Sequence, residues 1–238
     1  MMTGRETSEA QDPATGELPP PPRLRDYTKL PLLIIAVMSI TAMVLYPSLP
    51  ASIPAHWGVS GAPDAFSTKS FASVFFEPMI ALGIYVLLVV VPFFDPLRRS
   101  LKLSWRAYNI VIDAVVGMQA VVFGASMVAA YDNAFDVSKI VLISVGVLFA
   151  IIGNLMRSVT QNWTFGVRVR WTLSDDVVWR RTNRLGGYLF MAAGAITIVC
   201  AFLPAPFSIL LMLGAVFGIL VVTYVYSYLL YRKRHPEA

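Results

Sequence analysis

Charged residues are scarce in this sequence. Only 14% of its 238 residues are Asp, Glu, Lys or Arg, whereas 57% are hydrophobic, and the mean hydropathy is +0.66. A soluble domain carries roughly a quarter charged residues. Segments that contact lipid lose charge because moving it into the bilayer core costs free energy. The deficit therefore argues against a soluble domain and predicts an integral membrane protein.

Cysteine is almost absent as well. Cys200 is the only one, so the chain can form no internal disulfide and has no CxxC pair for metal or redox chemistry. A secretory signal peptide is also missing, because Met1–Asp26 is polar and proline-rich without an early apolar core. We expect this stretch, which contains four consecutive prolines, to be a disordered or extended cytoplasmic tail.

Long apolar runs dominate the rest of the sequence. Six segments each approach the ~20 residues that a helix needs to cross ~30 Å of hydrocarbon. We place them at Leu30–Tyr46, Val74–Phe94, Ala107–Tyr131, Lys139–Met156, Leu185–Leu203 and Phe207–Tyr231. The sequence thus predicts an all-α membrane protein with six transmembrane helices.

Basic residues occupy every second connection. Lys69 is the only Lys or Arg in the connections 47–73, 131–138 and 204–206. The basic blocks are 23–29, 98–106, 157–184 and 232–234. Because Lys and Arg concentrate in cytoplasmic loops, this pattern predicts a cell-membrane protein with both termini and the 157–184 loop in the cytoplasm. The same pattern explains the net charge of +5 without a nucleic-acid partner.

The predicted spans fall into two modules. Residues 30–130 form an N-terminal module of three helices with an outer loop at 47–73, and 139–231 form a second module with an inner loop at 157–184. Residues 1–29 form the tail. Only Pro204–Pro206 separates the last two spans, which must form an antiparallel hairpin. Glycines in these spans, including Gly214 and Gly218, predict close packing within the bundle, and a homodimer face is the alternative.

The outer loop is rich in proline and glycine. Its four prolines exclude a regular helix, and Gly58 and Gly61 suit tight turns. A metal site would need at least three converging ligands, such as His56, Asp64 and Glu77, but no ligand spacing supports one, so we predict none. Aromatic packing at the membrane interface is one interpretation of this loop. Binding of an extracellular ligand is the other.

The inner loop alternates between apolar and polar residues. Phe165, Val167, Val169 and Trp171 alternate with Gly166, Arg168, Arg170 and Thr172. A period of two predicts an extended or hairpin segment, with an apolar face toward the membrane and an arginine face toward water or an anion.

A short helix follows the alternating segment. Ser174 as N-cap, with Asp175 and Asp176 in the first turn, predicts a helix over 175–184 that leads into the fifth span. Its basic face beside Trp179 suits an anionic lipid surface. Clustered asparagines in the loop suggest a further role.

Polar residues inside the predicted spans are functional candidates, because each needs an internal partner. Asp113 lies about two turns into the third span, Gln119 lies deeper, and Asn154 is near the cytoplasmic end of the fourth. We expect Asp113 to pair with Arg157 or another arginine of the inner loop, which would anchor the loop. A proton or substrate relay is the alternative.

Both loops resemble the SdpI family of bacterial polytopic membrane proteins. The resemblance rests on Ile152–Arg157, Asn162–Trp179 and Thr182–Gly187 of the inner loop. The stretch Leu49–Asp64 resembles an uncharacterised N-terminal module that many family members carry. The inner loop departs from the family pattern at Thr160-Gln161, where Lys-Pro is expected, and at Asn183, where histidine is common.

The resemblance implies a function. The founding member is similar in span number, and it is both an immunity protein against a secreted peptide toxin and a receptor that holds a transcriptional autorepressor at the membrane. Carried over, this implies an outer surface over 56–69 that meets a peptide and an inner arginine loop that docks a cytoplasmic protein. We therefore expect a non-enzymatic protein of toxin resistance and signal transduction.

The sequence also allows two other functions. A small transporter or lipid-handling protein would use Asp113, Asn154 and the arginines to bind an anionic head group. A membrane enzyme would use His56, Asp64 and Glu77, although no nucleophile–base pair stands out.

The predicted partners are the lipid bilayer, an extracellular peptide, a cytoplasmic regulator and a second copy of the chain, with no nucleic acid, cofactor or metal. The predicted binding residues are Asn154, Arg157, Asn162, Gly166, Arg168, Arg170, Trp171, Trp179, Asn183, Arg184, His56, Trp57, Gly61, Asp64 and Asp113.

Overall fold

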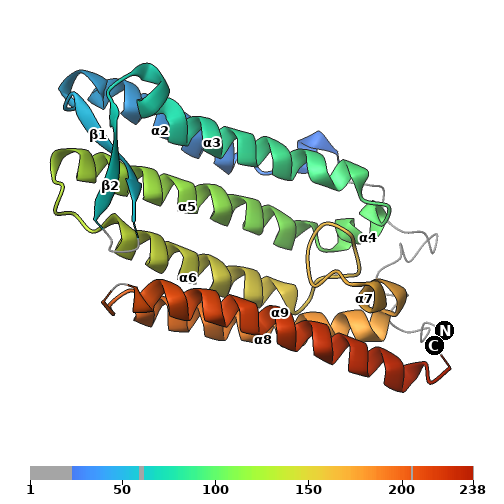
Figure 1. The fold of residues 1–238 in the computed structure, drawn as a ribbon. Coiled ribbons are helices and arrows are strands. Elements are labelled where there is room, and N and C mark those ends of the chain that lie inside the picture. Colours follow the sequence, from blue (N-terminus) through green and yellow to red (C-terminus); the bar gives the residue numbers. More distant parts are fainter. Residues whose placement is uncertain (1–22, 59–61, 205, 238) are drawn as a thin grey trace.

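Six long helices run side by side in an elongated bundle (Figure 1). The computed structural model describes residues 23–58, 62–204 and 206–237. The long helices are α2 (Leu30–Leu45), α3 (Phe71–Val90), α5 (Trp105–Tyr131), α6 (Val137–Met156), α8 (Asp176–Cys200) and α9 (Phe207–Arg234). The short helices are α4 (Arg98–Leu103) and α7 (Arg170–Ser174), with 3₁₀ turns η1 (Leu24–Asp26), η2 (Tyr46–Ser48) and η3 (Val91–Phe94).

All six long helices have the length and composition of membrane spans. The candidate spans are Leu30–Ser48, Phe71–Phe94, Trp105–Tyr131, Val137–Met156, Asp176–Cys200 and Phe207–Arg234. The predicted number of spans and the helical fold class are therefore confirmed. The fifth span begins at Asp176 rather than Leu185, so the short helix predicted over 175–184 is the first part of α8 and not a separate element.

The two ends of the bundle carry different structures (Figure 1). One end, called here the hairpin end, carries strands β1 (Ser52–Trp57) and β2 (Pro63–Thr68). The opposite end, called the loop end, carries α4, α7 and the segment between α6 and α8. Six crossings return the chain to the side from which it started, so α2 begins and α9 ends at the loop end.

The strands of the hairpin were not anticipated from the sequence. β1 and β2 pair antiparallel from Ser52 opposite Thr68 to Trp57 opposite Pro63, with register irregularities on either side of His56. The prolines do exclude a helix, as expected, but edge positions of a small sheet tolerate them. Ile53 is 5% exposed and packs into a core shared by α2, α3 and α5, which includes Met38, Val74 and Val116. The hairpin is thus fixed to the N-terminal three helices.

Glycine pairs bring α6 and α8 into close contact. A Cβ atom on Gly153 would lie 2.5 Å from the carbonyl oxygen of Gly187, and one on Gly194 would lie 2.5 Å from that of Gly146. Such distances exclude any side chain, so the two backbones touch directly. Close packing at Gly187 and Gly194 is therefore confirmed, but their partner is α6 rather than α9.

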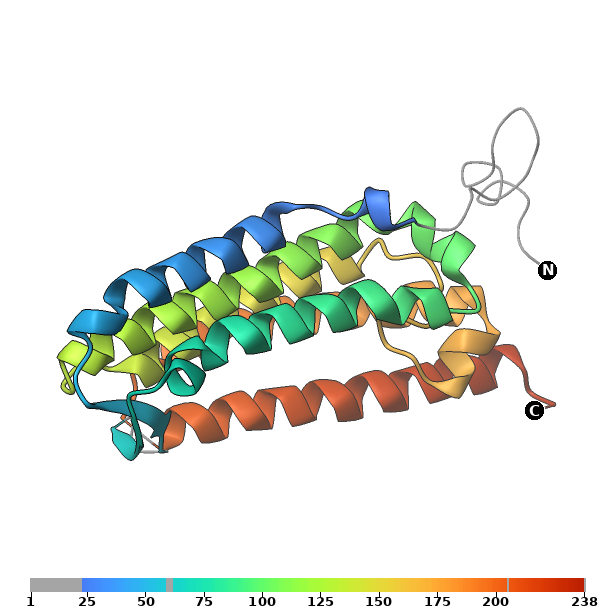
Figure 2. The same cartoon turned by 90° about the horizontal axis from the view of Figure 1, so that it is seen from above.

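Gly214 and Gly218 do not pack within the bundle. A Cβ atom on either residue would meet nothing within 4 Å. Figure 2 shows α9 along one edge of the bundle, with α2 along the opposite edge. The predicted packing role of these two glycines is wrong, because they lie on a side of α9 that no described residue covers. The homodimer face stays a prediction.

Candidate functional site

The segment between α6 and α8, residues 157–175, folds over the loop end and is called the arginine loop. It comprises an irregular stretch followed by α7. Its backbone is held by a few buried polar side chains. Nearly all the predicted binding residues of the inner loop lie in or beside it.

Asn162 organises the first turn of the arginine loop. Its side chain is 0% exposed. Its Oδ1 accepts hydrogen bonds from the amides of Thr164 (2.8 Å) and Phe165 (2.6 Å), and its Nδ2 donates to the carbonyl of Thr160 (2.7 Å). A side chain that replaces backbone partners in this way fixes a turn. Asn162 therefore shapes the loop and is not free to bind a ligand.

Gly166, Trp179 and Asn183 form one contact group between the loop and α8. Gly166 has φ of +124°, and a Cβ atom there would lie 2.6 Å from Asn183 Oδ1 and 3.0 Å from the Trp179 ring. Asn183 Oδ1 accepts from the Val167 amide at 2.8 Å. Trp179, 0% exposed, donates through Nε1 to the Val159 carbonyl at 2.8 Å. Both α8 side chains thus bind loop backbone.

The alternating segment is not a strand or a hairpin. The chain is irregular up to Val169 and helical from Arg170 to Ser174 in α7. Thr172 is 0% exposed, accepts from the Val169 amide and donates to the Val167 carbonyl. This hydroxyl starts a helical turn in the middle of the alternating pattern. The extended-segment prediction was wrong because one buried threonine outweighs a weak period of two.

Asp175, rather than Ser174, is the N-cap of α8. Its Oδ1 accepts from the amides of Val177 and Val178, and its Oδ2 accepts from Arg234 Nε (2.8 Å) and His235 Nε2 (3.0 Å). Burial opposes ionisation, but these bonds, led by that from Arg234, outweigh it and lower the pKa of Asp175 to about 2. Asp175 therefore ties the start of α8 to the end of α9.

Asp95 ties the arginine loop to the connection between α3 and α5. The side chain is 5% exposed, and its Oδ2 accepts from the Trp163 amide (2.9 Å) and the Thr164 hydroxyl (2.6 Å). Its Oδ1 accepts from the Leu97 amide. One feature of the sequence could have pointed to this residue, because Asp95 is the only acidic residue between Glu77 and Asp113.

A second link joins the same two connections. The hydroxyl oxygen of Thr160 accepts a hydrogen bond from the Ser104 hydroxyl (2.9 Å). The same Thr160 hydroxyl donates to the Ser100 carbonyl (2.8 Å). The Thr160 amide also donates to Ser104 Oγ.

Trp171 carries α7 onto α9. Its ring lies 5.5 Å from that of Tyr224 and 5.2 Å from that of Tyr228, centroid to centroid. Its buried Nε1 has no hydrogen-bond partner among the described residues. The arginine loop therefore contacts the α3–α5 connection, α8 and α9 through separate side chains.

The exposed surface of the loop is basic. Arg168 donates to the Trp163 carbonyl and is exposed, as are Arg170 and Arg184. Arg157 donates to Asn154 Oδ1 at 2.6 Å and lies over the ring of Tyr188 at 5.2 Å. The predicted residues thus divide into a buried set that shapes the loop and an exposed set of arginines that faces outward.

Asp113 does not anchor the loop. Its Oδ1 is buried without a hydrogen-bond partner, and no ion pair described in the structure joins it to Arg157. Its side chain interacts with Thr28, which precedes α2, and with Tyr85 of α3. Arg157 instead pairs with Asn154. The expected anchoring pair is therefore wrong, because the two side chains serve different helices.

The predicted outer-loop residues meet at the hairpin. His56 Nδ1 lies 2.6 Å from Asp64 Oδ1 across the two strands, and both side chains are at least half exposed. Trp57 packs against Ala125, Ala129 and Val137. Gly61 lies outside the described residues. Glu77 does not complete a metal site, since no group of three potential ligands is found within residues 23–58, 62–204 and 206–237.

Comparison with known proteins finds similarity to one membrane-protein family. Residues 158–227 match the SdpI/YfhL protein family, and residues 33–82 match a domain of unknown function (DUF1648). Over these residues the chain is similar to the SdpI/YfhL family. The immunity protein SdpI of Bacillus subtilis (strain 168) is 27% identical over 202 residues, covering 85% of this chain and 94% of that relative. No solved structure matches. The predicted family resemblance is confirmed.

The two matched regions include the structured parts of the hairpin end and the loop end. The SdpI/YfhL match begins inside the arginine loop and runs through α8 into α9. The DUF1648 match contains the β1–β2 hairpin. The chain is thus a multi-pass membrane protein that is similar to the SdpI family, with one structured region at each end of the bundle.

Proposed function

We propose that this protein confers resistance to a peptide toxin and signals its presence to a cytoplasmic regulator. The relative over most of the chain is named an immunity protein, and the protein has separate structured regions at its two ends. In this proposal the hairpin end faces outward and the arginine loop faces the cytoplasm, as the distribution of basic residues favours.

The buried hydrogen bonds of the arginine loop carry the proposal. Asn162, Gly166 and Asn183 fix its backbone, and Asp95 and Asp175 connect it to the surrounding helices. A loop that only marked membrane orientation would need none of these bonds. Their effect is to hold Arg168 and Arg170 in a defined arrangement on the exposed side, which suits an acidic surface of a protein partner.

Signalling requires that the two ends be coupled. α8 and α9 each extend from the hairpin end to the loop end, and Asp175 and Trp171 join the loop to both. A ligand that binds one arrangement of these helices more tightly shifts the loop by the same free-energy difference. A coupling of about 1–3 kcal/mol suffices for a response.

The test is protection of a sensitive host. The full chain is expressed in a Bacillus subtilis strain that lacks its own SdpI and is grown in medium conditioned by the parent strain. We expect survival to rise at least about tenfold over the empty vector, with the Gly153→Leu variant as a packing-defective control. Equal killing with and without the wild-type chain, at verified membrane levels, would remove the resistance function.

Signalling is measured separately in the same strain. Fluorescent fusions to the host's cytoplasmic repressors are imaged with and without conditioned medium. The proposal expects at least one fusion to move to the membrane only when both medium and chain are present. Protection without any such recruitment would leave resistance and reject signalling.

A further inference from the structure

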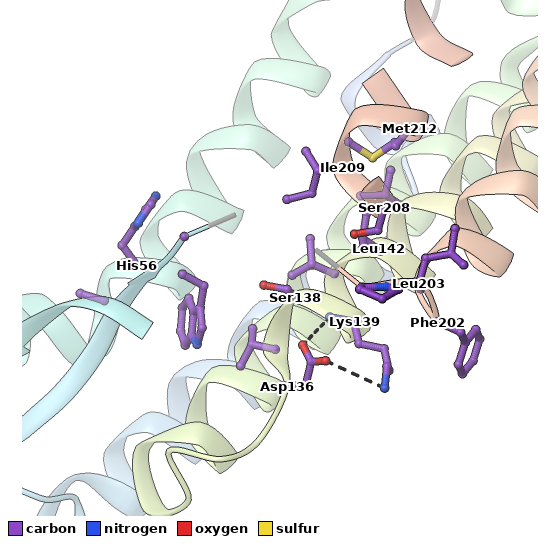
Figure 3. Close-up of a pocket in the computed structure, with 18 residues that line it drawn as sticks. His56, Asp136, Ser138, Lys139, Leu142, Phe202, Leu203, Ser208, Ile209 and Met212 are labelled. Carbon is purple, nitrogen blue, oxygen red and sulfur yellow. Dashed lines mark hydrogen bonds and ion pairs between the residues drawn. The ribbon is translucent and has the colours of Figure 1, made fainter. Parts of the chain in front are cut away.

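A cavity of about 640 Å³ lies at the hairpin end (Figure 3). It is bounded by the first turns of α6, the connection between α8 and α9, the first turns of α9, and β1. Its size falls in the usual range of ligand pockets, about 300–1,000 Å³. It has no part in the arginine loop, which is at the other end.

The walls of the cavity change from polar to apolar. Leu142 on α6 and Ile209 and Met212 on α9 form an apolar wall, while Asp136 and Lys139 stand at the start of α6 (Figure 3). Lys139 Nζ is 3.9 Å from Asp136 Oδ2, and both side chains are more than 40% exposed. This loose pair leaves both charges able to meet polar groups of a ligand. The cavity therefore suits a ligand with an apolar group beside a polar one.

The strand β1 presents its edge to the cavity. Four consecutive residues, Ala55 to Gly58, line it. Three of them, Ala55 to Trp57, are the last residues of β1, so the cavity follows the strand over several residues. No residue of β2 lines the cavity, and within the described residues β1 pairs only with β2. The free edge of β1 therefore borders the cavity.

The edge is held in a fixed position. Trp57 packs against α5 and the first residue of α6, and the His56–Asp64 pair joins β1 to β2. A free strand edge beside an apolar pocket is the arrangement that binds extended peptides by strand addition, in which backbone bonds give affinity and a pocket gives selectivity. A lipid chain would use the pocket but has no amides for the edge.

We propose that an extended peptide segment binds here, with its backbone along β1 and an apolar side chain in the cavity. This inference rests on the proposed function for the choice of a peptide, and it adds the site and the mode of binding. The site joins the region matched by DUF1648, through β1, to the region matched by SdpI/YfhL, through α9.

The test uses the full chain in lipid nanodiscs and a dansyl-labelled synthetic peptide of alternating leucine and threonine. Ile209→Trp fills the cavity, and Leu210→Trp is the matched control, because Leu210 is 60% exposed and does not line the cavity. We expect Ile209→Trp to weaken peptide binding by about tenfold or more and Leu210→Trp to leave it unchanged. Met212→Trp repeats the test from the next turn if Ile209→Trp fails to fold.

Hydrogen exchange tests the binding mode. Peptide should slow exchange of amides in the segment Ala55–Gly58 of the wild-type chain, and dansyl-labelled dodecanoic acid should not. Equal slowing by the fatty acid, or tight peptide binding that ignores Ile209→Trp and Met212→Trp, would overturn the proposal.

The outcome is separable from that of the proposed function. Peptide binding at β1 by a chain that gives no protection would reject resistance and keep this site. Full protection by the cavity-filled variants, together with peptide binding unaffected by them, would reject the site and keep resistance.

Discussion

Gly166 illustrates how single residues set the shape of the arginine loop. Its φ of +124° and its contacts with Asn183 and Trp179 leave no room for a side chain. We expect Gly166→Ala to lower the free energy of unfolding by about 1–3 kcal/mol. The measurement is thermal unfolding in detergent, followed by tryptophan fluorescence.

The control for this change is Gly124→Ala in α5. A Cβ atom there meets nothing within 4 Å and the backbone is helical, so stability should be unchanged or slightly raised. If both variants unfolded at the wild-type temperature, the contacts of Gly166 would not constrain the loop.

Asp175 makes the contact between α8 and α9 sensitive to acid. Its pKa is lowered from 3.8 to about 2 in the folded protein, so its contribution to stability is present above pH 3.8 and is lost as the pH falls through about 2. We expect about 1–2 kcal/mol, since its partner Arg234 is partly exposed and solvent screens the pair.

Asp175→Asn should remove this part of the pH dependence. Thermal unfolding measured from neutral pH down to about 2 should show a smaller acid destabilisation in the variant than in the wild type. Identical pH profiles would mean that the Asp175 contacts do not contribute. Asp132→Asn, in the connection at the hairpin end, is the control.

At the scale of elements, the arginine loop is the part that we expect to act on a partner. Replacing Arg168 and Arg170 with alanine should reduce recruitment of the cytoplasmic protein at least about tenfold, because exposed charges steer and orient a partner. Membrane insertion and thermal stability should remain. The readout is the fluorescent recruitment assay with toxin-containing medium.

A matched control removes two charges elsewhere at the same end. Arg232→Ala with Lys233→Ala, at the end of α9, should leave recruitment within about twofold of wild type, because neither residue belongs to the loop. Equal loss in both double variants would show that general positive charge, rather than the loop, attracts the partner.

The contact between α6 and α8 is the tightest between elements of the bundle. Gly153 and Gly187 touch through their backbones, so Gly153→Leu should separate the helices and destabilise the protein by about 3 kcal/mol or more. Thermal unfolding measures this directly. Gly214→Leu on α9 is the control, since the space beside it is open. A loss of stability in that control would indicate that a second copy covers α9.

Sequence patterns predicted whole spans better than local structure. The six helices followed from apolar length alone, because lipid contact imposes a composition on about twenty residues at a time. The β1–β2 hairpin could not be predicted in this way. Each of its strands is short, contains or begins with proline, and lacks a regular alternation of apolar and polar residues. Thr172 and Asp95 were also missed, because each acts on backbone groups that only the fold brings near.

For the candidate site, the sequence pointed to the arginine loop, but it could not predict which of its residues are buried. Asn162, Trp179 and Asn183 were predicted as binding residues and are buried against loop backbone. The division into exposed and buried residues depends on tertiary packing, which periodicity cannot supply. The cavity beside β1 involves three distant segments and had no signature in any one of them. The two-module division of the chain stays a prediction.

At the scale of the whole molecule, the property to measure is which end of the bundle faces the outside of the cell. In a Cys200→Ala background, Ala65→Cys at the hairpin end should react with a membrane-impermeant maleimide in intact cells. Ser158→Cys at the loop end should react only after permeabilisation. Both sites are exposed, so accessibility does not favour either. Labelling of both in intact cells would contradict the proposed sidedness.

The continuity of α8 has a mechanical consequence. This helix starts at the Asp175 cap and ends at Cys200, where the next residues border the cavity. Its 25 residues span about 37 Å at 1.5 Å per residue, so a tilt of a few degrees displaces its far tip by roughly 2 Å. We therefore expect α8 to transmit a displacement at the cavity to Trp179 and the arginine loop, because one continuous helix joins them.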